Sequence, residues 1–395
     1  MTAQQLKEIL AKLTEAEFID LIPDLTDVLR RTGTEYWWMK QQLFEAFEAK
    51  GFHITQAHFY SSQPTISELS PALWDGPRYL TPAFSVDIEG MKTLFRELSM
   101  FAKELADVRR TGTTGFYWDN VFFPNFDAII YYGLCRRFRP KVVLEVGSGF
   151  STHIALRAAE KNTVTQVHCI EPYPTPTLKA VEGRLSQILV QRVQDVPLDV
   201  FGKLQANDIL FVDTAHVSKI GGDLNHLLFK VLPCLPAGVF VHFHDIFLPY
   251  EYPREWITAR NWFWNEQYLL LAFLMYNEVF RTIFMVCKVF TSGRDVFDSE
   301  IPLEIIFDFR TRSRFTYVAK VLDHRVEDLD SIRQIGVYAI ERRLYVFRRL
   351  RTIQHICIHD LEEPGIQLLR LWYDFAVRQQ VAADHFDSCE RCRCR

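Results

Sequence analysis

The residues best suited to chemistry form two groups, and each follows the end of a predicted strand. The first group lies in KVVLEVGSGFST, where a buried strand ends at Glu145 and a helix opens near Ser151; between them stand Gly147, Ser148 and Gly149. Glycines let a ligand approach the backbone closely, and the first turn of a helix offers free N–H groups. This pattern predicts a turn that binds a cofactor.

The residues around this turn indicate an adenosine cofactor that carries a positive charge. A dinucleotide site needs a third glycine at the helix start for its pyrophosphate, and Thr152 occupies that place. We expect the Glu145 carboxylate to face the turn, where it would repel a pyrophosphate and suit an ammonium group. Glu171, which ends the second strand, is placed to hold two ribose hydroxyls. The alternative, that both acids merely cap strand ends, stays open.

A weaker signal follows the third predicted strand. Gln194 and Asp195 stand there, where a polar side chain would meet the edge of adenine. Polar residues after strands are common, so an ordinary loop explains the pair equally well.

The second group follows the fourth and fifth predicted strands. Asp213 and His216 follow one of them, and His244 and Asp245 follow the other. Open α/β sheets bind ligands at the carboxyl ends of their strands, so we expect these four side chains to converge on one crevice. Together they are suited to hold a divalent cation that polarises an acceptor, or to act directly as a base with its orienting partner. His242 lies within its strand, where the pleat fixes its direction.

These motifs resemble those of the class I S-adenosylmethionine (SAM) dependent methyltransferases. The resemblance covers residues 115–290 and rests on LEVGSGFST, a strand-ending IEP, FVDTAHVSK and VHFHDIF followed by PYEYPREW. It implies that one set of residues surrounds the methionine part of SAM, that Glu171 binds its ribose, and that Gln194 or Asp195 lies near adenine. The set is Glu145, Gly147, Gly149 and Ser151, with Ser148 in the same turn.

Metal-dependent O-methyltransferases of the catechol and macrolide-sugar types offer a further comparison. They place an acidic metal ligand where Asp213 stands here and two more ligands where His244 and Asp245 stand, which implies a cation such as Mg²⁺ at these residues. The chain departs from that pattern because the first of the later pair is normally Asp, so a metal-free mechanism remains open. The catechol type has a lysine base where His216 stands, and His216 is therefore a candidate general base.

The elements that must position these residues alternate between short apolar runs and amphipathic helices after Pro140. This alternation predicts an α/β domain with a doubly wound, mostly parallel Rossmann-like sheet. We expect strands at 142–146, 165–170, 188–193, 209–212, 239–243 and 282–289. The aromatic loop from Leu248 to Trp256 either walls the acceptor site or packs a helix onto the sheet.

The chain divides by pattern into three regions. Residues 1–114 form a helical and loop region, a possible substrate lid; 115–292 form the SAM-binding domain; and 293–395 form a mainly helical extension of unknown role. Within the extension, 303–309 is a candidate strand, and helix dominates from Tyr317 to Val381. The Arg-rich stretch 341–351 is typical of a solvated amphipathic helix, and a contact between identical subunits is a role open to it. The CERCRC tail suits a frayed end or a metal clip.

Composition narrows the partners. A formal net charge of -4 and a pI of about 6.3 argue against nucleic acid or an anionic membrane as the main partner. The charged N-terminal residues do not resemble a secretory signal, and charges interrupt the most apolar stretch, 268–290, so we expect a cytoplasmic protein with no membrane span.

Three functions remain open from the sequence. The first is transfer of a methyl group from SAM to a hydroxyl of a small molecule or a glycan, although N-methylation fits the same site. The second keeps the fold as an NAD-dependent oxidoreductase. The third is a catalytically silent SAM-binding or scaffold protein.

Overall fold

The structure is a computed structural model, and it describes residues 2–35, 38–123, 125–287 and 317–321. The chain divides into the units Met1–Asp323 and His324–Arg395. The second unit lies outside the described residues, as do the candidate strand 303–309, the Arg-rich stretch 341–351 and the cysteine tail.

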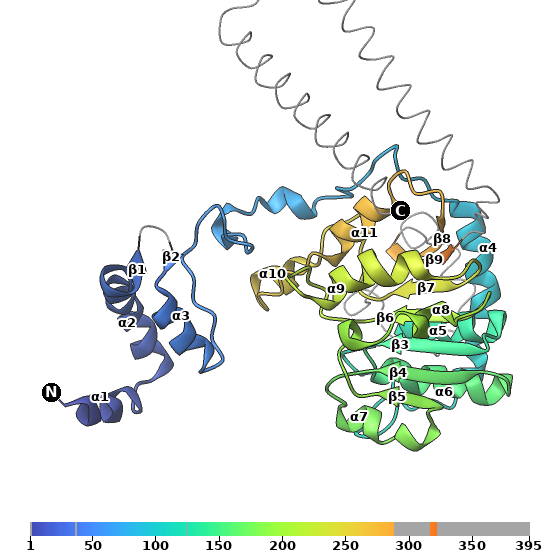
Figure 1. Cartoon of the computed structure of the whole chain (residues 1–395), viewed down its shortest axis with the longest axis horizontal. Coiled ribbons are helices and arrows are strands. Elements are labelled where there is room, and N and C mark those ends of the chain that lie inside the picture. The colour runs from blue at the N-terminus through green and yellow to red at the C-terminus, as the bar shows by residue number, and fades with distance from the viewer. Residues whose placement is uncertain (1, 36–37, 124, 288–316, 322–395) are drawn as a thin grey trace, which may run out of the picture. The chain divides into compact units, whose positions relative to one another are not determined.

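A seven-stranded sheet forms the centre of the first unit (Figure 1). Its strand order is β5-β4-β3-β6-β7-β9-β8, in which β3 to β7 are parallel and β9 runs antiparallel to both of its neighbours. The strands are β3 (Val142–Val146), β4 (Gln166–Ile170), β5 (Gln187–Leu189), β6 (Ile209–Val212), β7 (Phe240–Phe243), β8 (Phe280–Met285) and β9 (Tyr317–Val321). The predicted Rossmann-like, mostly parallel α/β fold is confirmed.

One strand of the sheet was not predicted. The pattern from Tyr317 onward indicates helix, yet residues Tyr317–Val321 form β9, which is inserted between β7 and β8. The prediction of helix is therefore wrong for these five residues. Its physical reason is that YVAKV has no period of its own long enough to decide, and pairing with the buried β7 determines the conformation.

Helices flank the sheet and close its core. The longer helices of this region are α4 (Ile88–Ser99), α5 (Asn125–Phe138), α6 (Phe150–Asn162) and α11 (Glu266–Leu274); the shorter ones are α7 (Pro176–Lys179), α8 (Asp199–Gly202), α9 (Asp223–His226) and α10 (Arg254–Thr258). Met91, Phe95 and Leu98 of α4 are fully buried in the same apolar core as β3 and β6. The core of the sheet thus draws on residues before 115 and after 292.

The N-terminal residues form a separate group of small elements. They are α1 (Ala3–Leu10), α2 (Glu15–Val28), a short π-helix (Leu29–Gly33), the strand pair β1 (Thr34–Glu35) and β2 (Trp38–Met39), and α3 (Gln41–Glu48). From residue 52 to 82 the chain is irregular, with 3₁₀ turns at Ile66–Glu68 and Pro71–Trp74, as its lack of a period predicts. In the part of the chain that is described, no helix has both the length and the apolar character to cross a bilayer.

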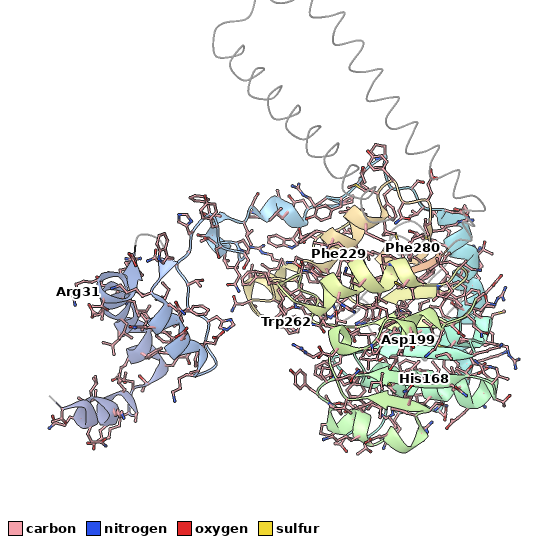
Figure 2. All side chains as sticks on the ribbon, in the orientation of Figure 1. Arg31, His168, Asp199, Phe229, Trp262 and Phe280 are labelled. Carbon is pink, nitrogen blue, oxygen red and sulfur yellow. The ribbon has the colours of Figure 1, made fainter. Side chains whose placement is uncertain are left out.

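Phe211 in the central strand β6 supports the core from the middle of the sheet. It is fully buried, and its ring packs against Tyr131 at 4.5 Å and His242 at 4.8 Å between centroids. We expect Phe211→Ala to lower the free energy of unfolding by about 3–5 kcal/mol, measured by urea denaturation, because it leaves a cavity. Phe229→Ala is the control: that side chain, labelled in Figure 2, is 63% exposed, and its loss should change stability by about 0.5 kcal/mol or less. Equal effects would contradict the assignment of the core.

Candidate active site

The glycine turn lies where β3 and β6 end side by side. Gly147 has φ +82°, and a Cβ at this position would lie 1.7 Å from the backbone oxygen of Asp213. A Cβ at Gly149, in contrast, would meet nothing within 4 Å, so the turn is open on that side. Position 147 must therefore be glycine for two reasons, and the turn keeps free space in which a ligand can approach the backbone.

Glu145 fixes this turn from within the core. The residue is fully buried, and its carboxylate accepts hydrogen bonds from the hydroxyls of Tyr131 at 2.9 Å and Thr152 at 2.5 Å. Thr152 Oγ1 in turn accepts from the backbone N–H of Gly149 at 3.0 Å. One carboxylate oxygen is thus bonded to α5 and the other to the first turn of α6. Glu145 therefore holds the turn in shape, and its contact with a bound ammonium group stays a prediction.

Glu171 lies where the sequence predicts it, at the end of β4 beside the glycine turn. Its carboxylate accepts from the backbone N–H groups of Ser148 at 3.2 Å and Tyr173 at 2.7 Å, and the side chain is half-buried. The Ser148 hydroxyl is buried and Ser151 is buried at the start of α6. This places a carboxylate at the open side of the turn.

Gln194 and Asp195 lie in the 3₁₀ turn Val193–Asp195, because β5 ends at Leu189 and not at 193 as predicted. Both side chains are engaged by protein groups. Asp195 forms a two-pronged ion pair with Arg192 at 2.8 and 3.0 Å. Gln194 donates from its side-chain amide to the backbone oxygen of Gly221 at 2.9 Å. Their proximity to adenine remains a proposal.

The four polar residues after β6 and β7 converge, as predicted. Asp213 Oδ1 lies 3.2 Å from His216 Nε2 and 3.2 Å from His244 Nδ1. Asp245 Oδ2 lies 3.8 Å from His216 Nε2 and 3.7 Å from His244 Nδ1. The Asp213 side chain is 30% exposed, whereas those of His244 and Asp245 are at 0%. Asp213 is thus the member of the group that an acceptor can reach.

Two further buried carboxylates back the histidines, and the sequence analysis missed both. Glu266, the first residue of α11, lies 2.7 Å from His216 Nδ1. Asp127 of α5 lies 3.8 Å from His244 Nε2. Each is an acid in the first turn of a helix and is followed by a run of mostly apolar residues, which is the signal that could have revealed it. Acids and imidazoles therefore alternate along a continuous polar row, made of Glu266, His216, Asp213, His244 and Asp127.

The row shifts the pKa values of its members. Burial alone would lower the pKa of His216, but hydrogen bonds to Asp213 and Glu266 outweigh it and raise the pKa to about 10. Burial alone would raise the pKa of Asp213, and the two neighbouring histidines lower it instead. For His244, the nearby Asp245 and Asp213 charges overcome burial and raise the pKa. The neighbouring carboxylates thus favour the charged form of both imidazoles.

A strap of irregular chain lies against the loop that follows Asp245. Trp74 donates from its indole N–H to the backbone oxygen of Tyr252 at 2.8 Å, and the backbone N–H groups of Arg78 and Tyr79 donate to Pro249 at 2.8 and 3.0 Å. The Glu251 carboxylate accepts from the hydroxyl of Tyr79 at 2.5 Å and also from that of Tyr268. The loop aromatics pack in a small core of their own, so this structure shows the packing role of the loop.

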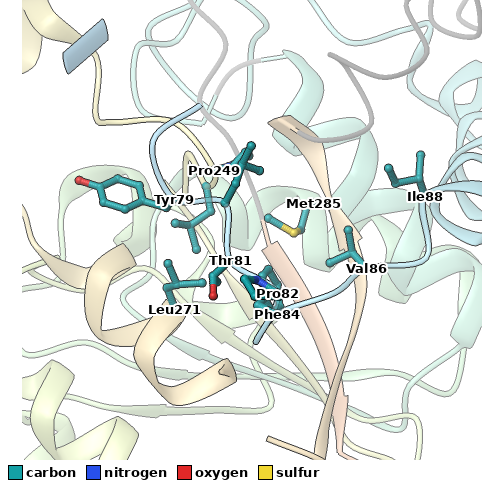
Figure 3. A pocket seen from close by; sticks show the side chains of 11 residues that line it. Tyr79, Thr81, Pro82, Phe84, Val86, Ile88, Pro249, Leu271 and Met285 are labelled. Atoms are coloured by element: carbon teal, nitrogen blue, oxygen red, sulfur yellow. The ribbon is translucent and has the colours of Figure 1, made fainter. Parts of the chain in front are cut away.

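The strap and the loop border an open apolar pocket of about 420 Å³ (Figure 3). Its walls include Tyr79, Phe84 and Pro249, with Leu271 of α11 and Met285 of β8. Leu271 lies on the same helix as Glu266, so one helix connects the pocket wall to the polar row.

Comparison with known proteins agrees with this fold. Residues 144–246 match a family described as a methyltransferase domain. This segment contains the glycine turn, Glu171 and the four polar residues after β6 and β7. This part of the chain is thus similar to a methyltransferase domain and has a Rossmann-like fold.

Individual relatives are distant. An uncharacterized protein of Archaeoglobus fulgidus is 36% identical over 98 residues, which span 24% of this chain and 44% of that protein. Among solved structures, the O-methyltransferase TomG of Streptomyces achromogenes in complex with SAM is 13% identical, with a TM-score of 0.32, and the match covers 60% of this chain and 92% of that one. The N-methyltransferase NodS of Bradyrhizobium japonicum in complex with S-adenosyl-L-homocysteine is 13% identical, with a TM-score of 0.30, over 59% and 98% of the two chains.

The close approach at Gly147 predicts a sharp effect of substitution. We expect Gly147→Ala to lower the free energy of unfolding by about 2–4 kcal/mol, the sum of a positive φ and an overpacked contact. Gly183→Ala is the control, because its Cβ would meet nothing within 4 Å and its φ is not positive. Thermal unfolding followed by circular dichroism would measure both variants, and a tolerated Gly147→Ala would contradict the contact.

Glu145 predicts a pH dependence of stability. Burial, partly offset by bonds to Thr152 and Tyr131, raises its pKa to about 7 from 4.5. The folded state therefore keeps a proton that the unfolded chain releases, so this group's contribution to stability falls as pH rises from 4.5 through 7, by about 3 kcal/mol in all. Glu145→Gln has no carboxyl group to titrate, so its stability should not fall in this way. Urea denaturation at pH 4.5 and 8 should show the variant gaining on the wild type at the higher pH; parallel pH profiles would refute the shift.

Proposed function

We propose that the chain is a SAM-dependent methyltransferase that methylates a hydroxyl group of a small-molecule or sugar acceptor. The observation that carries the proposal is the adjacency of two features. The open glycine turn with Glu171 lies beside the polar row, because Gly147 contacts the backbone of Asp213. A methyl donor held at the turn and an acceptor held at Asp213 would then meet between neighbouring strand ends.

The turn fits the donor on three counts. Gly149 leaves space for close approach, α6 begins there with its N–H groups, and Glu171 offers a carboxylate to ribose hydroxyls. A dinucleotide site would have its third glycine at position 152. Thr152 stands there instead, and its hydroxyl is bonded to Glu145. These features favour SAM over NAD.

The acceptor side supplies polarity and a destination for the proton. In the proposed reaction the acceptor oxygen attacks the sulfonium methyl carbon, the C–O bond forms, the C–S bond breaks, and S-adenosyl-L-homocysteine leaves. As the C–O bond forms, the hydroxyl proton passes to the carboxylate of the partly exposed Asp213, which first accepts the hydroxyl's hydrogen bond. A divalent cation bound at Asp213, Asp245 and a histidine would polarise that hydroxyl.

Binding and turnover measurements test the proposal directly. We expect the purified full chain to bind SAM and not NAD in calorimetry, and Glu171→Gln to weaken SAM binding about tenfold or more, because a charge-assisted hydrogen bond is lost. Asp213→Asn should keep SAM affinity and lose methyl transfer to hydroxyl acceptors. Glu160→Gln, on the exposed surface of α6, is the matched control.

Two outcomes would overturn the proposal. Binding of NAD alone would support an oxidoreductase on the same fold. Binding of SAM without transfer to panels of hydroxyl and amine acceptors would support a silent SAM-binding protein.

A further inference from the structure

We propose that Asp213, His216 and Asp245 form a site for a divalent transition metal, and that Glu266 orients His216 as a ligand. The inference deepens the proposed function by assigning a cation class to the acceptor side. It depends on that function only for the role of the metal, since metal binding is measured by itself.

The first argument is the orientation of the imidazole. Glu266 Oε2 lies 2.7 Å from Nδ1, which leaves Nε2 facing Asp213 at 3.2 Å and Asp245 at 3.8 Å. A histidine that binds a metal commonly gives its other nitrogen to a carboxylate, which fixes the ring and its tautomer. Glu266 occupies the place of such a supporting carboxylate.

The second argument is that the ring has little freedom to turn away. The backbone oxygen of His216 accepts from the N–H groups of Asn265 at 3.1 Å and Glu266 at 3.2 Å. The Trp264 ring lies over the imidazole with 4.2 Å between centroids. The start of α11 therefore holds both the backbone and the side chain of His216, although it lies 50 residues further along the chain.

The third argument is the spacing and access of the ligand atoms. One atom each from Asp213, His216 and Asp245 lie within 4.8 Å of one another. Metal to ligand distances of about 2.0–2.2 Å require ligand atoms roughly 3–4.4 Å apart, so small shifts complete the site. Asp213 is 30% exposed, which leaves one side of the site open to an acceptor oxygen. Three protein ligands with an open position are typical of catalytic metal sites.

The fourth argument concerns which metal the ligands prefer. Mg²⁺ binds oxygen ligands and retains its water, whereas imidazole suits Zn²⁺, Co²⁺, Ni²⁺ or Fe²⁺. Two carboxylates with a carboxylate-supported imidazole therefore favour a transition metal. His216 stands where the catechol-type enzymes carry their lysine base. In this proposal the same position supplies a metal ligand instead.

The test uses chelator-treated full-length protein and the metal alone. We expect one equivalent of Co²⁺ to bind and to produce a visible absorption band, with Mg²⁺ at least about 100-fold weaker in calorimetry. His216→Gln should weaken Co²⁺ binding about 100-fold or more, and Glu266→Gln about 10–100-fold. His168→Gln, on β4 outside the row, should bind as the wild type does.

Each outcome decides one of the two proposals. Absence of Co²⁺ binding, Mg²⁺ binding as tight as Co²⁺, or binding insensitive to both His216→Gln and Glu266→Gln would overturn the metal site while leaving SAM binding intact. Co²⁺ binding without methyl transfer would leave the site and overturn the function. The SAM affinity of each variant reports whether the variant is folded. If His216→Gln is not folded, the Co²⁺ affinity of Glu266→Gln decides the test.

Discussion

Where β3 and β6 end, the two strands approach so closely that a Cβ at position 147 would lie 1.7 Å from the backbone oxygen of Asp213. The backbone N–H of Asp213 also donates to Val146 at 2.9 Å, which keeps the strand ends in register. This contact joins the open glycine turn to the first residue of the polar row. The neighbouring features depend on it, because a wider separation would divide the two halves of the proposed reaction between distant places.

The buried carboxylates on the two sides of this contact have pKa values shifted in opposite directions. Glu145 is held by neutral hydroxyls, and burial raises its pKa to about 7. Asp213 lies between two histidines, which lower its pKa despite burial. Burial favours the proton on Glu145 because its hydroxyl partners only partly offset the loss of water, whereas the two imidazoles beside Asp213 keep that carboxylate ionised. Glu145 therefore acts on the shape of the turn, and the charge available for chemistry gathers at Asp213.

The acceptor side is built from segments far apart in the chain. The strap from Trp74 to Tyr79 is hydrogen-bonded to the loop 249–252, and that loop continues from Asp245. The first three residues of α11 then connect these parts: Glu266 contacts His216, Gln267 accepts from the backbone N–H of Phe247 at 3.0 Å, and Tyr268 contacts Glu251. A change in the conformation of the strap would thus be transmitted to the polar row through the first turn of α11.

The sequence by itself determined the α/β class, six of the seven strands and the glycine turn. It also determined the position of Glu171 and the convergence of Asp213 and His244. Strand periodicity, turn glycines and strand-end residues are local patterns, which is why the sequence carries them. Tertiary structure alone decided three things. β9 formed because β7 offered an edge, Glu145 faced the core because α5 and α6 brought hydroxyls to it, and Glu266 joined the row through a contact 50 residues away. Such long-range contacts depend on packing, which no local period records.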